Sequence, residues 1–304
     1  MASGLEVIIN RPRPSTLQRF WRSPLVFLAQ TIYHYCARRI PPAELPIDSV
    51  TVVCISDTHN YQPALPDGDI LIHAGDLTQS GSFTELQATI AWLRRQPHPH
   101  KIVVVGNHDL LLDPSQDRSP DYAATREQLD WGDIIYLENS ETVVTCANGR
   151  RLHVYGSPQS PKHGNWAFQY HRNHDAWTET VPSNTDILVT HGPPRAHLDL
   201  NLGCNYLLSE LWRVRPRLHV CGHIHEGRGQ EWLVFDQLQH DFETTIIGKG
   251  DVWNFLRVLA ELLRWLLLTK LYSIRIKART QLVNAAMVGG LRDEEKRVAI
   301  KLTI

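Results

Sequence analysis

Five short apolar runs, each ending in polar residues, constrain the fold of this chain more than any other feature. The runs are "SVTVVCISDTHN" (49–60), "DILIHAGDLT" (69–78), "KIVVVGNHDL" (101–110), "DILVTHGPP" (186–194) and "RLHVCGHIH" (217–225). Continuous apolar runs of this length are typical of β-strands that are buried on both faces. A chain of 304 residues is long enough to enclose them in a substantial core.

The segment between the second and third runs, "GSFTELQATIAWLRRQ" (81–96), has the spacing of a helix. Leu86, Ile90 and Leu93 recur at helical intervals, and Ser82 with Glu85 matches a capping box at the start of the segment. Strand, helix and strand in this order indicate α/β architecture.

A hairpin is predicted at 141–158, where two apolar runs flank "ANGR". An Asn-Gly pair between two such runs favours a tight β-turn. Segments 280–290 and 297–304 have the pattern of returning strands. The sheet structure is therefore predicted to be mixed.

The chain divides by sequence into an N-terminal leader and one large domain. The leader, 1–48, is partly apolar. Pro24 breaks its apolar segment 19–39 near the start, and the part after Pro24 could form one amphipathic helix. The domain covers 49–304 and contains an apolar helical insertion at about 252–272.

The insertion 252–272 is predicted to be a helix with one narrow polar stripe, formed by Asn254, Arg257, Glu261 and Arg264. We interpret it first as a helix buried by the rest of the domain or by a second subunit. The alternative is a helix that lies on a membrane surface. A transmembrane span is disfavoured, because three charges would sit in its middle.

The polar residues that end the five runs are types that bind metal ions. They are Asp57, His59, Asp76, Asn107, His191, His223 and His225. In open α/β sheets ligands bind at the carboxyl ends of the strands, so these side chains are expected to form one metal site. Seven donors are too many for one ion and suit two ions bridged by one carboxylate. Their mixture of oxygen and imidazole suits Mn, Fe or Zn.

The blocks "SDTH", "GDLT", "GNHD", "THGPP" and "GHIH", in this order, resemble the signature of the calcineurin-like metallophosphoesterases. The metallophosphoesterase-domain-containing phosphodiesterases and the class III cyclic-nucleotide phosphodiesterases are the most similar members. The resemblance implies an α/β fold with four layers, an α-β-β-α sandwich of two mixed sheets flanked by helices.

The resemblance also implies a role for each metal-binding residue. A first metal would be held by Asp57, His59 and His225. A second metal would be held by Asn107, His191 and His223. Asp76 would bridge the two ions, which would be Mn in preference to Fe or Zn.

His108, in the third block, would not be a ligand. By the same resemblance it would be the catalytic residue that faces the substrate phosphate and protonates the leaving oxygen. A hydroxide held between the metals would attack phosphorus in line. Such chemistry makes the chain a phosphoric ester hydrolase.

Two departures from the family bear on the substrate. Protein phosphatases of this superfamily have a second Asp after "GD" and an Arg before "GNH", but here Thr78 and Gln79 follow Leu77, and Val105 precedes Gly106. No Tyr follows the "GD" block, as it does in purple acid phosphatases. A phosphodiesterase acting on small phosphodiesters, including cyclic nucleotides, is therefore the favoured interpretation.

Substrate contacts are predicted in the loop 160–177, which is rich in aromatic residues. His163, Trp166 and Phe168 could stack on a nucleobase or an aryl leaving group, although ordinary packing of the loop is the alternative. His197 lies near the fourth block and could support the site from behind the ligands.

The remaining expectations concern partners and location. A formal net charge of −1 gives no indication of a nucleic-acid polymer as partner. Five cysteines, odd in number and without a C-x-x-C pair, suggest free thiols in a reducing compartment, hence the cytoplasm. The alternative function is a weakly active or non-catalytic protein of this fold that acts as a peripheral-membrane or partner-binding module through 252–272, where self-association is also possible.

Overall fold

The computed structural model describes residues 15–39, 45–116, 125–272, 279–290 and 293–304. Contacts divide the chain into two compact units. The first, called the helical unit here, comprises Met1–Pro42 and Val234–Ala278. The second, called the sheet unit, comprises Ala43–Leu233 and Arg279–Ile304.

The first sheet of the sheet unit has five strands in the order β15-β1-β2-β3-β4. Strands β1 to β4 run parallel, and β15 pairs antiparallel with β1. Their bounds are Thr51–Ile55 (β1), Ile70–Ala74 (β2), His100–Val104 (β3), Ile134–Tyr136 (β4) and Ile300–Thr303 (β15).

The second sheet has six strands in the order β11-β12-β10-β9-β6-β5. Strands β12, β10, β9 and β6 are parallel, while β11 and β5 at the two edges are antiparallel. The bounds are Ser140–Thr145 (β5), Arg151–Ser157 (β6), Ile187–Thr190 (β9), Leu218–Cys221 (β10), Gly229–Leu233 (β11) and Thr280–Asn284 (β12). Short pairs are formed by β7 (Ser160–Pro161) with β8 (Gln169–Tyr170) and by β13 (Val288–Gly289) with β14 (Glu295–Lys296).

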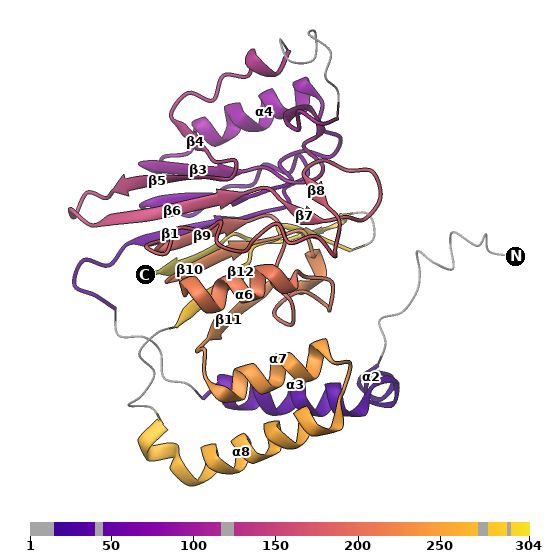
Figure 1. Cartoon of the computed structure of the whole chain (residues 1–304). Coiled ribbons are helices and arrows are strands. Elements are labelled where there is room, and N and C mark those ends of the chain that lie inside the picture. The colour runs from indigo at the N-terminus through magenta and orange to yellow at the C-terminus, as the bar shows by residue number, and fades with distance from the viewer. Residues whose placement is uncertain (1–14, 40–44, 117–124, 273–278, 291–292) are drawn as a thin grey trace, which may run out of the picture. The chain divides into compact units, whose positions relative to one another are not determined.

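The two sheets pack face to face through alternate residues of their strands. Val52, Ile72 and Ile102 of the first sheet meet Val154 and Val189 of the second in one buried cluster. The other face of the first sheet packs against helix α4 (Phe83–Arg94), and helix α6 (Asn205–Val214) covers the second sheet (Figure 1). The predicted α-β-β-α arrangement of two mixed sheets flanked by helices is confirmed.

Local signals in the sheet unit correspond to the elements that they predicted. Ser82 caps α4, and its hydroxyl and the Glu85 carboxylate form the reciprocal capping box. The "ANGR" segment joins β5 and β6 as an antiparallel hairpin. The short 3-10 helix η1 (Leu110–Leu112) follows the third polar block, and η2 (His225–Gly227) begins at the last residue of the fifth.

The helical unit contains four helices within its described residues: α2 (Thr16–Arg22), α3 (Pro24–Ala37), α7 (Gln237–Ile247) and α8 (Val252–Tyr272). Helix α3 contacts both α7 and α8. The Tyr33 ring of α3 stacks on Phe242 of α7 with centroids 4.2 Å apart. The apolar part of the leader is thus joined to the insertion by direct packing.

The contacts therefore divide the chain differently from the sequence. The part of the leader after Pro24 is one helix, α3, as expected, and Pro24 occupies its first turn. The separate short helix α2 before Ser23 was not expected. The insertion is longer than 252–272, since α7 precedes α8 in the same unit. Periodicity gives the helix at 252–272 but not the partner against which it packs.

The cysteines and the helices of the described residues can be compared with what the sequence predicts about thiols and membrane spans. All five cysteines are free, as predicted, and all five are also buried. None of the helices in the described ranges combines the length and the apolar character needed to cross a membrane.

Candidate metal centre

The seven predicted ligands come from the carboxyl ends of five strands in two sheets. Asp57 and His59 follow β1, Asp76 follows β2, and Asn107 follows β3. In the second sheet His191 follows β9, while His223 and His225 follow β10. Because β1, β2 and β3 are parallel, and so are β9 and β10, each set of strand ends lies at one edge of its sheet.

Hydrogen bonds between the sheets bring these two edges together. The His191 Nδ1 lies 3.0 Å from the Ala74 carbonyl oxygen at the end of β2. The backbone N–H of His223 donates to both carboxylate oxygens of Asp57, at 3.0 Å each. The centre therefore forms only when both sheets are in place.

A first group of donors is formed by Asp57, His59, Asp76 and His225, whose ligand atoms all lie within 4.8 Å of one another. The Nε2 atoms of His59 and His225 are 3.3 Å apart. His225 Nε2 is also 3.3 Å from Asp57 Oδ1. Imidazole nitrogens and carboxylate oxygens that converge in this way can share one divalent cation.

A second group is formed by Asp76, His191 and His223, again within 4.8 Å. Asn107 belongs beside it, because its Oδ1 is 2.9 Å from His191 Nε2. Asp76 is shared by the two groups. Its Oδ2 is 3.7 Å from His59 Nε2 and 3.4 Å from His191 Nε2.

The tautomer of His191 suits a ligand. A carbonyl oxygen only accepts hydrogen bonds, so His191 Nδ1 carries the proton that it donates to Ala74. Its Nε2 is then the atom that faces Asp76 and Asn107. A backbone carbonyl behind the imidazole is the usual support for a metal-binding histidine.

Glycines make the room that these side chains occupy. A Cβ at Gly222 would overlap the Asp57 carboxylate and the Ser56 side chain, and a Cβ at Gly106 would overlap the Asp76 carboxylate. At Gly75, where φ is +105°, it would overlap the His191 ring. The close approach of backbone and ligand atoms explains the glycine in three of the four blocks that contain one.

The electrostatics of the group also fit cations. Burial alone would raise the pKa of Asp57, but the neighbouring His225 lowers it to about 2. Burial opposes protonation of His191, yet Asp76 raises the pKa of that imidazole to about 9. The buried carboxylates of Asp57 and Asp76 are thus stabilised by nearby positive charge. A divalent ion at either donor group would provide that charge in place of the proton on a histidine ring.

Asp109 holds the second and third blocks together from beneath the ligands. Its buried carboxylate accepts hydrogen bonds from Gly106 N at 2.8 Å, Thr78 Oγ1 at 2.8 Å and Leu77 N at 3.2 Å. Burial, and then the nearby Asp76, raise the pKa of Asp109 to about 6. Asp109 therefore positions the loops that present Asp76 and Asn107.

His108 lies beside both groups without belonging to either. Its Nδ1 donates to the Gln79 carbonyl at 2.8 Å, and its backbone N–H donates to Asp76 Oδ1 at 2.8 Å. The ring packs against His59 at 4.6 Å and is stacked on Trp166 at 4.2 Å. With Nδ1 so committed, Nε2 is the nitrogen that His108 can offer to a substrate.

The four predicted substrate-binding residues are placed in two different ways. Trp166 stacks on His108, and the His163 ring lies 5.1 Å from that of His223, so both are next to the centre. Phe168 instead packs against the buried cluster of α4 and the first sheet. His197 is fully buried, with Nδ1 3.0 Å from Glu231 Oε1. Phe168 and His197 therefore both have partners elsewhere in the sheet unit.

Sequence reasoning missed several residues that hold the "GHIH" turn. Asn284, at the end of β12, donates to the Ile224 carbonyl at 2.9 Å, and Arg297 donates to the His225 carbonyl at 2.6 Å. Asp293 Oδ1 is 3.3 Å from His225 Nδ1. Asn284 carries the same signal as the ligands, a polar residue at the end of an apolar run, whereas Asp293 and Arg297 carry none.

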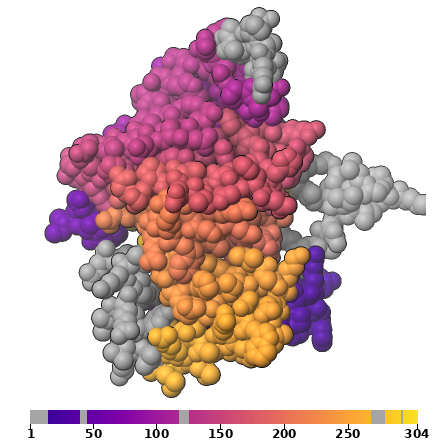
Figure 2. Space-filling view, in the orientation of Figure 1, coloured from indigo at the N-terminus to yellow at the C-terminus, as the bar shows by residue number. Residues whose placement is uncertain are grey.

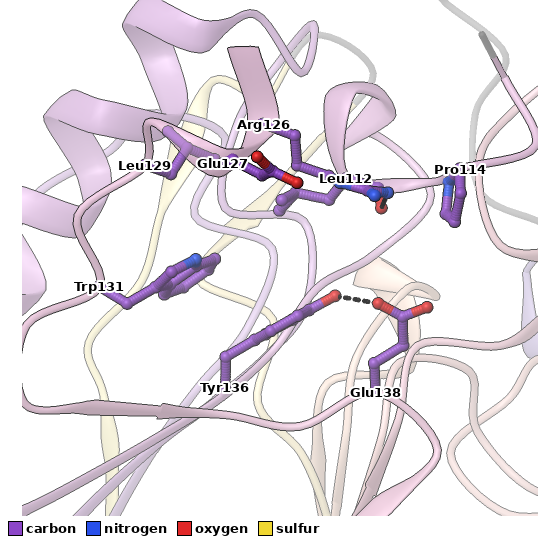
Figure 3. Close-up of a pocket in the computed structure, with 8 residues that line it drawn as sticks. All are labelled: Leu112, Pro114, Arg126, Glu127, Leu129, Trp131, Tyr136 and Glu138. Atoms are coloured by element: carbon purple, nitrogen blue, oxygen red, sulfur yellow. Dashed lines mark hydrogen bonds between the residues drawn. The ribbon is translucent and has the colours of Figure 1, made fainter. Parts of the chain in front are cut away.

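A separate pocket of about 400 Å³ lies near β4 and η1 (Figure 3). Trp131 and Tyr136 stack there at 4.8 Å, and the Tyr136 hydroxyl donates to Glu138 at 2.7 Å. None of its eight lining residues is a predicted ligand or substrate contact. The residues that line this pocket are therefore different from those of the candidate metal centre.

Comparison with known proteins places these observations in a family. The family described as calcineurin-like phosphoesterase matches residues 50–227, which is more than half of the chain. This range contains all seven candidate ligands and His108.

Individual proteins match the chain over different lengths. A protein of Emericella nidulans named probable rhamnogalacturonate lyase C is 44% identical over 99% of this chain and 29% of its own length. Human metallophosphoesterase domain-containing protein 1 is 38% identical over 58% of this chain and 61% of its own length. The chain thus spans less than two thirds of either relative. A solved structure, TT1561 of Thermus thermophilus, covers 61% of this chain and 85% of its own, with 17% identity and a TM-score of 0.42.

Proposed function

The chain belongs to the calcineurin-like phosphoesterase family, and we propose that it is a dinuclear metal-dependent phosphodiesterase that hydrolyses small phosphodiesters. One observation carries the proposal: Asp76 is common to two donor groups, with a single carboxylate oxygen facing His59 in one and His191 in the other. A shared carboxylate is the feature that a pair of metal ions requires. We propose Mn as the resident metal, with Fe and Zn as the alternatives compatible with these donors.

The residues divide the work as follows. Asp57, His59 and His225 would hold one divalent cation, and Asn107, His191 and His223 the other, with Asp76 between them. Such ions, when bound, activate water and neutralise charge on the phosphoryl oxygens. The side chains of the protein would supply proton transfer and the positioning of the substrate.

His108 is proposed as the general acid. Its Nδ1 proton is fixed on the Gln79 carbonyl, so a second proton on Nε2 is available for the leaving oxygen of the substrate. Stacking of Trp166 restricts the ring and shields one of its faces from water. The loop is held in turn by Asp113, which accepts from Phe168 N at 2.8 Å, and by Gln116, which donates to the Trp166 carbonyl at 3.2 Å.

The preference for phosphodiesters over phosphoproteins is supported by two positions. Protein phosphatases of this superfamily have an acidic residue close to the position of Thr78. Here Thr78 is buried, and its hydroxyl donates a hydrogen bond to Asp109. Val105, where they have an arginine, is buried in the cluster under α4. A small substrate with a flat group, such as a cyclic nucleotide, suits the aromatic edge formed by Trp166 and His163.

The name of the fungal relative describes a protein of which this chain spans 29%, so lyase activity is not proposed for it. The complete donor set also argues against a non-catalytic role, since His223 and His108 are both in place. The five free cysteines support a cytoplasmic location as part of the same proposal.

The substrate class can be tested with metal-depleted protein reconstituted with Mn, Fe(II) or Zn. We expect a bis-aryl phosphodiester and a cyclic nucleotide to be hydrolysed faster than an aryl phosphomonoester or a phosphopeptide. Preference for the monoester would overturn the diester assignment. If no phosphoester is hydrolysed with any of the three metals, the enzyme proposal itself fails.

A graded series of variants tests the assignment of residues. Asp76→Ala should lose both metals and all activity, whereas His223→Gly should retain about one metal per chain by elemental analysis. His108→Asn should keep both metals while turnover falls by about 10²- to 10⁴-fold. His153→Asn, a histidine change on β6 outside the donor groups, is the matched control and should behave as wild type. Equal metal content in Asp76→Ala and wild type would contradict the shared site.

A further inference from the structure

Helix α8 exposes a continuous apolar face. Val252, Leu256, Leu263 and Leu267 follow one another at helical intervals of four, seven and four, and the side chain of Leu267 is 83% exposed. Trp253, at 75%, stands beside this row. The buried side of the same helix is different, because Phe255 and Val258 are enclosed. Within a single chain, therefore, only one side of α8 is buried.

Positive charge borders this apolar face. Arg257 and Arg264 are exposed along one edge, between the apolar row and Glu261. Glu261 is less exposed and accepts a hydrogen bond from Arg264 at 3.4 Å. The polar stripe seen in the sequence thus presents mainly guanidinium groups to the outside.

Charge is distributed unevenly between the two units of the chain. Residues 1–42 and 234–278 contain twelve Lys and Arg against six Asp and Glu, a formal charge of +6. The remainder contains 19 Lys and Arg against 26 Asp and Glu, a formal charge of −7, which restores the −1 of the whole chain. The near-neutral total therefore conceals a basic helical unit and an acidic sheet unit.

We propose that the helical unit docks on the surface of an anionic lipid bilayer, with α8 lying in the plane of the interface. The row from Val252 to Leu267 would enter the acyl boundary, and Arg257 and Arg264 would meet lipid phosphates. Trp253 has the amphipathic ring that favours the interface. Charges in the middle of α8 exclude a spanning orientation, and a net charge of +6 is complementary to an anionic leaflet.

Helix α2 repeats the same combination of residues. Leu17 and Trp21, four positions apart, are exposed, and Arg19 and Arg22 accompany them. Both segments of the sequence that build the helical unit therefore present apolar and basic side chains together. In Figure 2 the orange residues around position 250, which include the start of α8, reach the surface.

Vesicle co-sedimentation of the full chain tests the docking surface. Wild type should pellet with vesicles of phosphatidylcholine and phosphatidylserine, less with phosphatidylcholine alone, and less again as salt is raised. Leu256→Ser with Leu263→Ser should weaken binding by about tenfold or more, because the apolar insertion is lost. Both side chains are exposed, so the fold should be retained, as circular dichroism and the melting temperature would show.

Val298→Ser is the matched control, since Val298 is an exposed apolar residue of the sheet unit. It should pellet as wild type does. Equal pelleting of the double variant and wild type would overturn the proposal, as would absence of binding to anionic vesicles. A wild-type dimer in solution that the double variant converts to a monomer, without vesicle binding, would assign the face to a second copy of the chain instead. These results do not depend on hydrolysis of any phosphoester.

Discussion

Four of the candidate ligands have a left-handed backbone conformation: Asp57, His59, Asp76 and His223, with φ between 43° and 66°. Residues other than glycine adopt this region at a cost of about 1–3 kcal/mol each. The surrounding hydrogen bonds hold these conformations. Asp57 N donates to the Gly75 carbonyl at 2.8 Å, for example, and His59 N to the Asp76 carbonyl at 3.2 Å. Strain of this kind gathers where function needs a fixed direction for a side chain.

Gly222→Ala should abolish tight metal binding at the first donor group, because the new Cβ would push the Asp57 carboxylate aside. Gly192→Ala is the matched control. It also lies beside a candidate ligand, His191, but a Cβ there meets only ordinary contacts at 3.6–3.7 Å. Isothermal titration calorimetry with Mn would compare the metal affinities of the two variants. Similar Mn affinity in the two variants would contradict the close packing inferred at Gly222.

At the scale of elements, the turn after each strand matters more than the strand itself. The strands supply parallel ends, whereas the turns supply the donors and the glycines. Helix α4 helps to fix the second of these turns, because its capping carboxylate, Glu85, also accepts hydrogen bonds from Ser80 and Asn60. Asn60 follows the first block, so α4 joins the loops after β1 and β2.

Ser82→Ala should lower the free energy of unfolding by about 1 kcal/mol, since the helix loses the hydroxyl that accepts the Glu85 N–H. Thr84→Ala, a change within the same first turn at a side chain that is not buried, should be close to neutral. Urea unfolding of both variants provides the measurement. A loss as large for Thr84→Ala as for Ser82→Ala would show that the cap is not the cause.

At the scale of the whole molecule, the candidate metal centre lies between the strand ends of two sheets. Donors from β1, β2 and β3 meet donors from β9 and β10, so an unfolded chain has no preformed site. Cations that bind only the folded state stabilise it by mass action, by about 2.7 kcal/mol at a free concentration about one hundred times the dissociation constant.

Removal of metal should therefore lower the melting temperature of wild type by several degrees, and Mn should restore it. Asp76→Ala should show no such difference between chelator and Mn, because its donor groups are broken. Differential scanning calorimetry in both conditions gives the result. An equal response of Asp76→Ala would locate the stabilising metal elsewhere in the chain.

Much of the centre could be predicted because it is encoded locally. Each candidate donor directly follows an apolar run. The order of the five blocks indicates the family, and the resemblance to that family implies which residues would bind each metal. The exceptions have a physical cause. Phe168 lies in the same aromatic loop as Trp166, but its positive φ of 51° and its hydrogen bond to Asp113 turn it toward the core. The ring of His197 forms a hydrogen bond with the carboxylate of Glu231, which is 34 positions away in the sequence.

The sequence by itself determined the strands, the capped helix, the hairpin, the candidate donors and the family to which the chain belongs. Hydrophobic periodicity and turn chemistry are properties of neighbouring residues, so they can be read without the fold. The tertiary structure decided how the Asp76 carboxylate lies between the two donor groups. It alone decided that the leader packs with α7 and α8. It alone also decided which side of α8 faces outward. Those features depend on contacts between segments far apart in the chain, such as Tyr33 with Phe242, and no local pattern records the partner of a buried face.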